Sequence, residues 1–452
     1  MMTTPRGCRP RVAAGVTIGR GPARSFATLL VLWVVAIAAV VLASVSASSA
    51  AQASAGREAL ARVRAFWAAR AAVEQALALI DFDTENPVDG DAFALIEDLA
   101  NHARGELRDA AWIITHETSS GERLGVMDAH AKININLATA EQLALIPDMS
   151  EDGPDSILDW IDADDDTRPL GAESGYYLGR PFPYEPRNGP MRSIAELELV
   201  IGMSPELVRG EDWNLNGRLD ENEDDGDVSW PPDNADGRLD AGLSAYLTTA
   251  SVDGGLAASG EARLDLATAT ASQVSQRIGV DALQADVIVA YAATSNAQMS
   301  EFIRRTLRQL AQTAGIQNAA AIRNLTREQQ AVLFNEAGIA LTAGTKPGKL
   351  NINTCEAETL QYLPEITPAL ADAIILERSS RPNGFSSIVD LLDVPAMTPQ
   401  RLARIAGILD VRSNVFVASC RGRDARSGIE VEIIATIDRS TVPAVLKEVR
   451  IR

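Results

Sequence analysis

An uncharged run near the N-terminus limits the possible folds of this 452-residue chain more than any other part of its sequence. Between Ser25 and Gly56 there is no charged residue and no proline, and about 20 apolar residues from Phe26 to Val45 are enough for a helix to span a bilayer. Arginines precede the run, and no Asp or Glu occurs before Glu58, so the N-terminus is predicted to stay in the cytoplasm. A cleaved secretory signal, with small residues at 50–53 as its cleavage site, is the alternative.

Apolar residues keep a helical spacing beyond this run. Leu60, Val63 and Trp67 recur at intervals of three or four, and charged residues stand between them. The pattern predicts one helix from Phe26 to about Leu79, roughly 80 Å long at 1.5 Å per residue. A helix that is half embedded in lipid and half projecting is typical of type IV pilins and pseudopilins.

The segment 24–33, Arg-Ser-Phe-Ala-Thr-Leu-Leu-Val-Leu-Trp, resembles the start of the minor pseudopilin K family of type II secretion, also called general secretion pathway protein K. The resemblance implies a cytoplasmic leader, residues 1–25, which a prepilin peptidase removes between Ser25 and Phe26. Ser25 stands where the family usually has Gly. The resemblance also implies that the fifth mature position lacks the Glu of other pilins, and here that position is Leu30.

Segments that alternate or are rich in β-branched residues stand at both ends of the remaining chain. The predicted strands are 111–115, 123–128, 414–421, 429–438 and 445–452. A helix is predicted over 93–109. We expect an α+β fold in which the long N-terminal helix packs on a small antiparallel sheet made from both ends, with a large, mainly α-helical insertion between them.

The insertion contains an internal repeat. Lys-Ile-Asn-Ile-Asn and a following helix at 132–147 return as Lys-Leu-Asn-Ile-Asn and a helix at 349–364, and 263–269 is a weaker third copy. The continuation of the 349–364 copy looks like a helix-hairpin-helix (SAM-like) unit. In DNA-binding versions, glycine amides of the hairpin approach a phosphate. The hairpins here are acidic and the net charge is −20, so packing is predicted and nucleic acid is not a predicted partner.

The same Lys-x-Asn-x-Asn units occur in the α-helical insertion of pseudopilin K. The acidic run at 159–166 and the Gly-Ala-Glu at 171–173 also resemble that family. The predicted segments are 1–25 (leader), 26–48 (transmembrane helix), 49–131 (long helix and first part of the pilin-like domain), 132–210 (first helix-hairpin-helix-like domain), 211–250 (acidic calcium-loop insertion), 251–345 (helical segment), 346–410 (second helix-hairpin-helix-like unit) and 411–452 (C-terminal strands).

Residues 211–240 hold eleven acidic side chains, and within them 212–223 fits the twelve-residue calcium loop. Oxygen-bearing side chains fall at loop positions 1, 3, 5, 9 and 12, Gly217 takes the sharp turn at position 6, and Leu219 takes the apolar position 8. A bare acidic surface is the alternative. The predicted Ca²⁺ ligands are Asp212, Asn214, Asn216, the carbonyl of Arg218, Asp220 and Glu223.

Two other segments resemble such a loop. Residues 234–240 repeat its core, but Pro232 and Leu243 occupy positions 1 and 12, which predicts at best a partial site. A second candidate set has oxygen ligands at positions 1, 3, 5 and 12 but no Gly at position 6, and the resemblance implies calcium in the soluble domain. Its members are Asp162, Asp164, Asp166 and Glu173.

No catalytic motif is found, and the three histidines follow no ligand spacing, so the chain is predicted not to be an enzyme. Cys355 and Cys420 allow one disulfide, but two buried thiols are favoured.

The sequence therefore predicts a minor pseudopilin at the tip of the type II secretion pseudopilus, which starts or caps the filament for protein export. It would cross the inner membrane once through residues 26–48 and carry its C-terminal domain in the periplasm. The resemblance implies I- and J-type minor pseudopilins, the inner-membrane platform and the prepilin peptidase as partners. The alternatives are a membrane-tethered helix-hairpin-helix protein of DNA uptake and a secreted calcium-binding structural protein.

Overall fold

The computed structural model describes residues 23–452 except 89, 119–120, 227, 318–320 and 342–343. It has two compact units, one up to Ala61 and one from Arg62 to Arg452, and helix α1 (Ala23–Glu85) contributes to both. In the first unit the apolar side chains from Phe26 to Val45 are exposed. Within the described residues, α1 is the one helix that is long and apolar enough to cross a membrane. Most of the predicted leader, residues 1–22, lies outside the described part.

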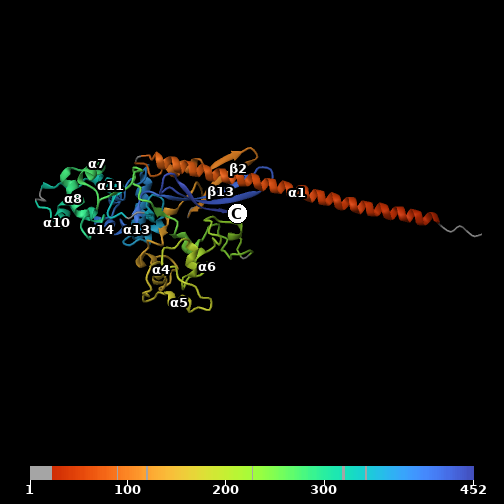
Figure 1. Cartoon of the computed structure of the whole chain (residues 1–452), viewed down its shortest axis with the longest axis horizontal. Helices are drawn as coiled ribbons and strands as arrows, with labels where there is room; N and C mark the ends of the chain where they lie inside the picture. Colours follow the sequence, from red (N-terminus) through yellow and green to blue (C-terminus); the bar gives the residue numbers. More distant parts are fainter. Residues whose placement is uncertain (1–22, 89, 119–120, 227, 318–320, 342–343) are drawn as a thin grey trace, which may run out of the picture. The chain divides into compact units, whose positions relative to one another are not determined.

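The two ends of the second unit meet in a seven-stranded antiparallel sheet (Figure 1). The strands are β1 (Arg104–Leu107), β2 (Ala110–Thr118), β3 (Gly121–Leu124), β4 (Met127–Asp128), β13 (Val415–Asp424), β14 (Glu430–Asp438) and β15 (Val445–Ile451). Their order is β1-β2-β13-β14-β15, with β3 beside β2 and β4 beside β13. Cys420 lies opposite Ile114, and Phe416 lies opposite Asp128. The predicted sheet made from distant ends of the chain is therefore confirmed.

The C-terminal part of α1 packs on one face of this sheet. Small residues of the helix such as Ala72 and Ala76 are fully buried in a shared core with Phe416. A Cβ added at Gly422 would collide with the carbonyl oxygen of Ala65, so the helix and β13 approach more closely than a side chain at 422 would allow. Alanine on the helix and glycine on the strand thus set the spacing of the two layers.

Helix α2 (Ala94–Asn101) adds Leu95 and Leu99 to the same core. The prediction of one helix over 93–109 is wrong beyond Asn101. Arg104–Leu107 instead pair with Ala110–Ile113, and the ring of Trp112 covers Gly105. Long-range pairing in the sheet overrides the local helical pattern here.

Everything between β4 and β13 forms an insertion that contains three similar modules. Each module opens with a two-residue strand, which pairs in parallel with a later two-residue strand that closes it. The pairs are β5 (Ile133–Asn134) with β6 (Leu247–Thr248), β8 (Leu264–Asp265) with β9 (Ala337–Gly338), and β11 (Leu350–Asn351) with β12 (Leu409–Asp410). The weak copy at 263–269 is thus the start of the second module.

Short helices fill the modules, and one antiparallel pair, β7 (Val252–Asp253) with β10 (Lys346–Pro347), joins the segments between them. The first module has α3 (Ala140–Leu143), α4 (Gly153–Ile161), α5 (Ser174–Leu178), η2 (Ile194–Leu199), α6 (Pro205–Arg209), η3 (Glu221–Glu223) and η4 (Gly242–Ala245), after η1 (Ala129–Ala131). The second has α7 (Ala271–Ile278), α8 (Ala282–Ala292), α9 (Glu301–Arg304), α10 (Leu307–Thr313) and α11 (Arg327–Glu336). The third has α12 (Ala357–Gln361), α13 (Pro368–Ser380), η6 (Ile388–Asp393) and α14 (Pro399–Ile405).

The same side-chain contact opens each module. Oδ1 of Asn134, Asp265 or Asn351 accepts the backbone N–H of the residue two positions later, at 3.0, 3.1 and 2.9 Å respectively. Such turns are a common use of Asn and Asp, because the short side chain reaches its own backbone. The second module keeps this turn with Asp, which explains why its sequence repeat is weak.

The second asparagine of the repeat ties the module together. Asn136 donates to the carbonyl and accepts the N–H of Met191, and Asn353 does the same with Phe385. Each contact joins the residues that follow the module's first strand to the segment just before the helix η2 or η6. The Lys-x-Asn-x-Asn motif therefore serves packing.

The turn after the first helix of each module has a positive φ. The residues are Asp148 (58°), Gly279 (73°) and Glu365 (67°). The Glu365 carboxylate accepts a hydrogen bond from Arg404 at 2.5 Å, so it closes the third module on itself. Carboxylates at two of these turns are unsuited to a phosphate backbone.

Cys355 and Cys420 are both buried and free. Burial raises the pKa of Cys355 to about 12 and raises that of Cys420 as well. Both are therefore inert core thiols, as the sequence favoured.

Candidate metal centres

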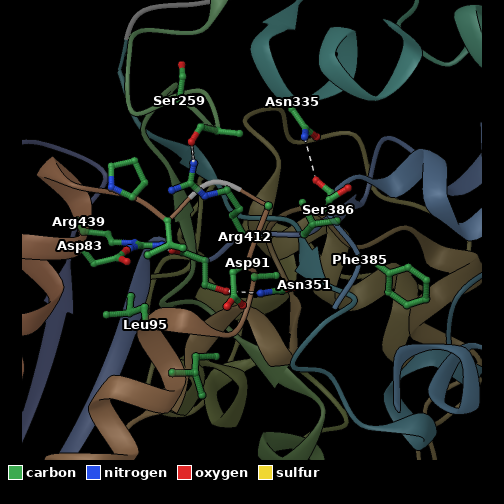
Figure 2. Close-up of a pocket in the computed structure, with 18 of the residues that line it drawn as sticks. Asp83, Asp91, Leu95, Ser259, Asn335, Asn351, Phe385, Ser386, Arg412 and Arg439 are labelled. Carbon is green, nitrogen blue, oxygen red and sulfur yellow. Dashed lines mark hydrogen bonds and ion pairs between the residues drawn. The ribbon is translucent and has the colours of Figure 1, made fainter. Parts of the chain in front are cut away.

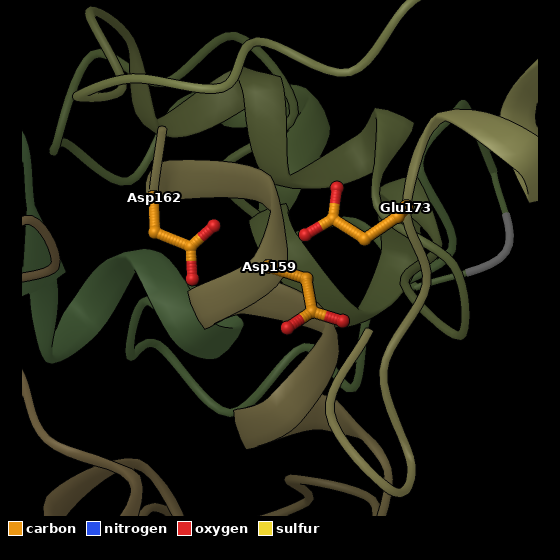
Figure 3. A group of neighbouring side chains, drawn as sticks. All are labelled: Asp159, Asp162 and Glu173. Atoms are coloured by element: carbon orange, nitrogen blue, oxygen red, sulfur yellow. The ribbon is translucent and has the colours of Figure 1, made fainter. Parts of the chain in front are cut away.

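Three carboxylates of the first module converge on one point (Figure 3). Asp159 and Asp162 lie one turn apart at the end of α4, and Glu173 directly precedes α5. One oxygen of each lies within 4.8 Å of the others. Asp159 and Glu173 are buried. A Cβ at Gly171 would collide with Asp159 Oδ2, so glycine is required where the loop passes the cluster.

Arg168 neutralises part of this cluster. Its Nη1 donates to Asp159 Oδ1 and to Asp162 Oδ2, each at 2.5 Å. Both oxygens of Glu173 and Oδ1 of Asp162 are buried without a hydrogen-bond partner among the described residues. An unpartnered buried carboxylate is costly, so the cluster is incomplete without a further positive group.

The electrostatics of Glu173 reflect this deficit. Burial, followed by the charges of Asp159 and Asp162, raises the pKa of Glu173 to about 7. Carboxylate oxygens are the ligands that Ca²⁺ and Mg²⁺ prefer in proteins. The cluster therefore has the donor set and the missing charge of a divalent-cation site.

This centre only partly coincides with the predicted set of Asp162, Asp164, Asp166 and Glu173. Asp162 and Glu173 do converge, but Asp164 and Asp166 are exposed and lie outside the group. Oδ1 of Asp164 accepts the N–H of Asp166 in a local turn. The loop numbering does not include Asp159, because Asp159 joins the cluster through a helical turn, in which residues three apart share a face.

The loop 212–223 has a sharply turned backbone, with φ of 54° at Leu215 and 67° at Gly217. Asp212 holds this turn, because its Oδ1 accepts the N–H of Asn216 at 2.9 Å and its Oδ2 accepts the N–H of Gly217 at 3.0 Å. The Arg218 N–H donates to Asn216 Oδ1 at 2.8 Å. The first half of the predicted loop is thus wound around its own side chains.

The predicted side-chain ligands of this loop share one network. Glu223 returns to the start of the loop and accepts the N–H groups of Trp213 and Asp220, at 3.2 and 3.1 Å. Asn214 and Asn216 donate to Asp220 Oδ2, at 2.7 and 2.9 Å. Amide groups therefore stand between the carboxylates. Among the described residues, Asp159, Asp162 and Glu173 are the three carboxylates whose oxygens come within 4.8 Å of one another. The carboxylates of the loop 212–223 do not come together in this way.

Buried oxygens at this loop are also short of positive charge. Asp212 and Glu223 are buried, and Oδ1 of Asn214 has no partner among the described residues. Burial raises the pKa of Asp212, and burial with the charges of Asp212 and Asp220 raises that of Glu223 to about 7. The residues present fit a hard cation bound by oxygen.

The loop 234–240 repeats the geometry of 212–223. Ala235 and Gly237 have φ of 52° and 74°, close to the values in the first loop. Asp224 Oδ1 accepts the N–H of Gly237 at 2.9 Å, and the two oxygens of Glu211 accept the N–H groups of Asn234 and Asp240. Asp224 and Glu211, which flank the first loop, thus take the places that Asp212 and Glu223 have there. By the spacing of the twelve-residue calcium loop, Pro232 and Leu243 would stand at these two positions, 1 and 12.

A pocket of about 250 Å³ lies at the junction of the sheet, α2 and the modules (Figure 2). Its two arginines are engaged in structure: Arg439 pairs with Asp83 and donates to the carbonyl of Ser413, and Arg412 donates to the carbonyls of Ala257 and Ala258. The charged side chains of this pocket therefore hold the surrounding elements together, and the two metal centres remain the candidate functional sites.

Residues 127–210 match the family model described as Type II secretion system (T2SS), protein K. Residues 346–410 match the helix-hairpin-helix motif. No curated protein sequence matches the chain.

Among solved structures, a chain of the GspK-GspI-GspJ complex from the Type 2 Secretion System of enterotoxigenic Escherichia coli is similar, with a TM-score of 0.46 and 15% sequence identity over 88% of this chain and 99% of that chain. The protein K match spans the first copy of the repeat, its hairpin turn and the Asp159–Asp162–Glu173 cluster. Residues 127–210 of this chain are thus similar to the type II secretion system protein K family.

Proposed function

We propose that this chain is a minor pseudopilin of type II secretion and that it occupies the tip of the pseudopilus, where it starts or caps the filament. The observation that carries the proposal is the size of the insertion. All 286 residues from 129 to 414 are inserted between β4 and β13, two strands that pair directly. A subunit with that bulk on its sheet domain has no room between stacked neighbours, so the end of the filament is the place that accommodates it.

The uncharged fifth mature position supports the same placement. Leu30 is exposed in an apolar stretch of α1. A Glu there would need a positive partner inside the membrane, because a lone charge in lipid is costly. A subunit with no pilin above it has no neighbouring N-terminal amine to neutralise.

Membrane attachment follows from α1. We propose a single pass through the inner membrane at residues 26–48, with the arginine-rich start in the cytoplasm and the folded domain in the periplasm. A prepilin peptidase would cut between Ser25 and Phe26. Mass spectrometry of the membrane-extracted protein tests this step, and a mature start near residue 53 would support the secreted alternative.

The proposed partners are the I- and J-type minor pseudopilins and the inner-membrane platform. In the similar solved structure, GspK forms a complex with GspI and GspJ. On this chain an apolar surface of the projecting part of α1 is available, with Trp67 exposed beside Phe66 and Leu107. We propose this surface for helix-to-helix contact with those partners.

We propose Ca²⁺ as the cation of both centres. Asp159, Asp162 and Glu173 would hold it in the cluster. In the loop, the ligands would be Asp212, Asn214, Asn216, the carbonyl of Arg218, Asp220 and Glu223. In both centres the cation would supply the positive charge that the buried glutamate lacks.

We propose a structural and not an enzymatic role, which is what the match of residues 127–210 to the protein K family model implies. The alternative of DNA uptake requires a basic surface, whereas this chain has a net charge of −20 and carboxylates at two of its three hairpin turns.

Immunogold labelling of an epitope in the second module tests the tip position in pseudopili assembled from all subunits. Gold at one end of each filament is expected, and gold along the shaft would contradict the proposal. Leu30→Glu should allow some entry into the shaft. Leu29→Glu, the matched control, places the same charge one position away and should not.

A further inference from the structure

The loop 212–223 is docked on the sheet by residues far away in sequence. Its Gly217 carbonyl accepts the N–H of Glu117 in β2 at 3.3 Å. Its Leu215 and Asn214 carbonyls accept from Arg450 at 3.4 Å and Arg452 at 2.5 Å, in and just after β15. The segment that carries the proposed cation ligands therefore also makes contacts between the first module and the strands β2 and β15 of the sheet.

Arg218 stands between the loop and the sheet. Its guanidinium pairs with Asp220, a proposed ligand, and its Nε lies 3.6 Å from Oε1 of Glu432 in β14. That Nε is buried and makes no hydrogen bond with the described residues. Arg218 is therefore an internal counter-charge for Asp220 that already faces a second carboxylate.

We propose that the loop and strand β15 form a cation-operated latch, with Arg218 as its moving part. This inference rests on the proposed cation site at 212–223. When Asp220 turns to a bound cation, its charge is no longer available to Arg218, and the guanidinium pairs with Glu432 on the sheet. The loop is then held to the sheet by Arg218, Arg450 and Arg452 together.

The physical consequence is that the order of the sheet edge at β15 depends on the bound cation. Strand β15 pairs only with β14 in the described part of the sheet, and its Val449 and Ile451 are exposed, so its far edge is open to local fraying. Ordering of the Asn214 and Leu215 carbonyls fixes two arginines at this strand. Cation occupancy in the first module should therefore reduce the fluctuations of β15.

Hydrogen exchange of the full chain in detergent micelles, with calcium and with chelator, tests the latch. Calcium should slow exchange both in 212–223 and in β15, and leave β1, on the opposite edge, unchanged. In Arg450→Ala/Arg452→Ala the loop should still be protected, but the effect in β15 should be lost. Val449→Ala, at an exposed position of the same strand, is the matched control and should behave as the unmodified chain.

The outcomes separate the two claims. A loop protected by calcium with an unchanged β15 would overturn the latch and leave the cation site standing. A loop that calcium does not protect would overturn the proposed site itself, and the latch with it.

The role of Arg218 has its own test. Arg218→Ala removes the competitor for Asp220, so the loop should bind calcium more tightly, by about 2- to 5-fold for the loss of a part-exposed ion pair. Arg238, at the same place in 234–240, gives the matched control Arg238→Ala, which should leave the affinity unchanged. Calorimetry on the full chain measures the calcium affinity of both variants. If Arg218→Ala bound calcium as weakly as the control or more weakly, the proposed movement of Arg218 from Asp220 to Glu432 would be overturned.

Discussion

The two candidate metal centres bring carboxylates together by different means. Asp159 and Asp162 meet because a helix places residues three apart on one face, and Glu173 closes the group from a loop. In 212–223 the backbone itself wraps around its side chains, and the amides of Asn214 and Asn216 separate the carboxylates. Regular structure crowds the charges, whereas the loop spreads them over hydrogen bonds.

Both centres carry an arginine, but the two arginines do different things. Arg168 bridges Asp159 and Asp162 within the cluster, whereas Arg218 pairs with Asp220 and also faces the sheet. In each centre one buried glutamate, Glu173 or Glu223, keeps a pKa of about 7. The comparison teaches that a local arginine does not fully compensate a buried carboxylate cluster, so both centres should respond to added cation.

The largest effect is expected when both centres are disabled. At a calcium concentration a hundredfold above each Kd, every occupied site stabilises the fold by about 2.7 kcal/mol, so two sites give roughly 5 kcal/mol. Glu173→Gln/Glu223→Gln should lose this stabilisation. Thermal melts of the full chain with calcium and with chelator measure it, and Glu141→Gln/Glu221→Gln, at exposed acidic positions, is the control.

The single variants sharpen the comparison. Glu173→Gln and Glu223→Gln should each lose about half of the calcium effect, about 2.7 kcal/mol, because the centres are separate. If Glu173→Gln alone removed the whole effect, the loop 212–223 would be only an acidic surface. If Glu223→Gln alone removed the whole calcium effect, the cluster would bind no calcium, and Arg168 alone would provide its positive charge.

The next effect concerns pH in the absence of calcium. Glu173 and Glu223 have folded pKa values near 7, above that of an unfolded Glu, so the folded state holds their protons to higher pH. Stability should therefore fall as pH rises from about 4.5 through about 7, by roughly 2 kcal/mol for each glutamate. Urea unfolding across this range measures the slope. Either Gln variant should flatten it in part, and an unchanged slope in both would break the argument from burial.

The smallest effect is expected for the internal counter-charge of the cluster. Arg168→Gln should destabilise the metal-free chain by about 1 kcal/mol, because Asp159 and Asp162 each lose a hydrogen bond. It should also increase the calcium affinity of the cluster, since the competing guanidinium is gone. Arg192→Gln, at an exposed position of the same module, is the control, and a weaker calcium affinity in Arg168→Gln would show that Arg168 builds the site.

Much of the fold was predictable because its signals are local or repeated. The uncharged run gave α1, the strand-like segments at both ends gave the sheet, and the paired asparagines gave the first and third modules. The limits lie where distant contacts decide. The helix expected over 93–109 ends at Asn101 because Arg104–Leu107 find partners in β2.

The candidate sites show the same division. The side-chain ligands expected in 212–223 share one network because they lie in a single loop register. Asp159 joins its cluster through a helical turn, and Glu211 and Asp224 complete 234–240 from outside its register. The spacing of the calcium loop identifies ligands that follow one another within that loop. Ligands that come from a helix or from outside the loop can be identified only once the fold is known.

The insertion between β4 and β13 also has a consequence for the order of folding. Cys420 and Ile114 are neighbours in the sheet although 306 positions separate them, and closing a loop of that length is slow and entropically costly. Each module, however, closes on its own strand pair: Ile133 with Leu247, Leu264 with Ala337, and Leu350 with Leu409. Modules that fold first replace most of a long flexible loop by rigid bodies, and so shorten the path by which the last strands find the first ones.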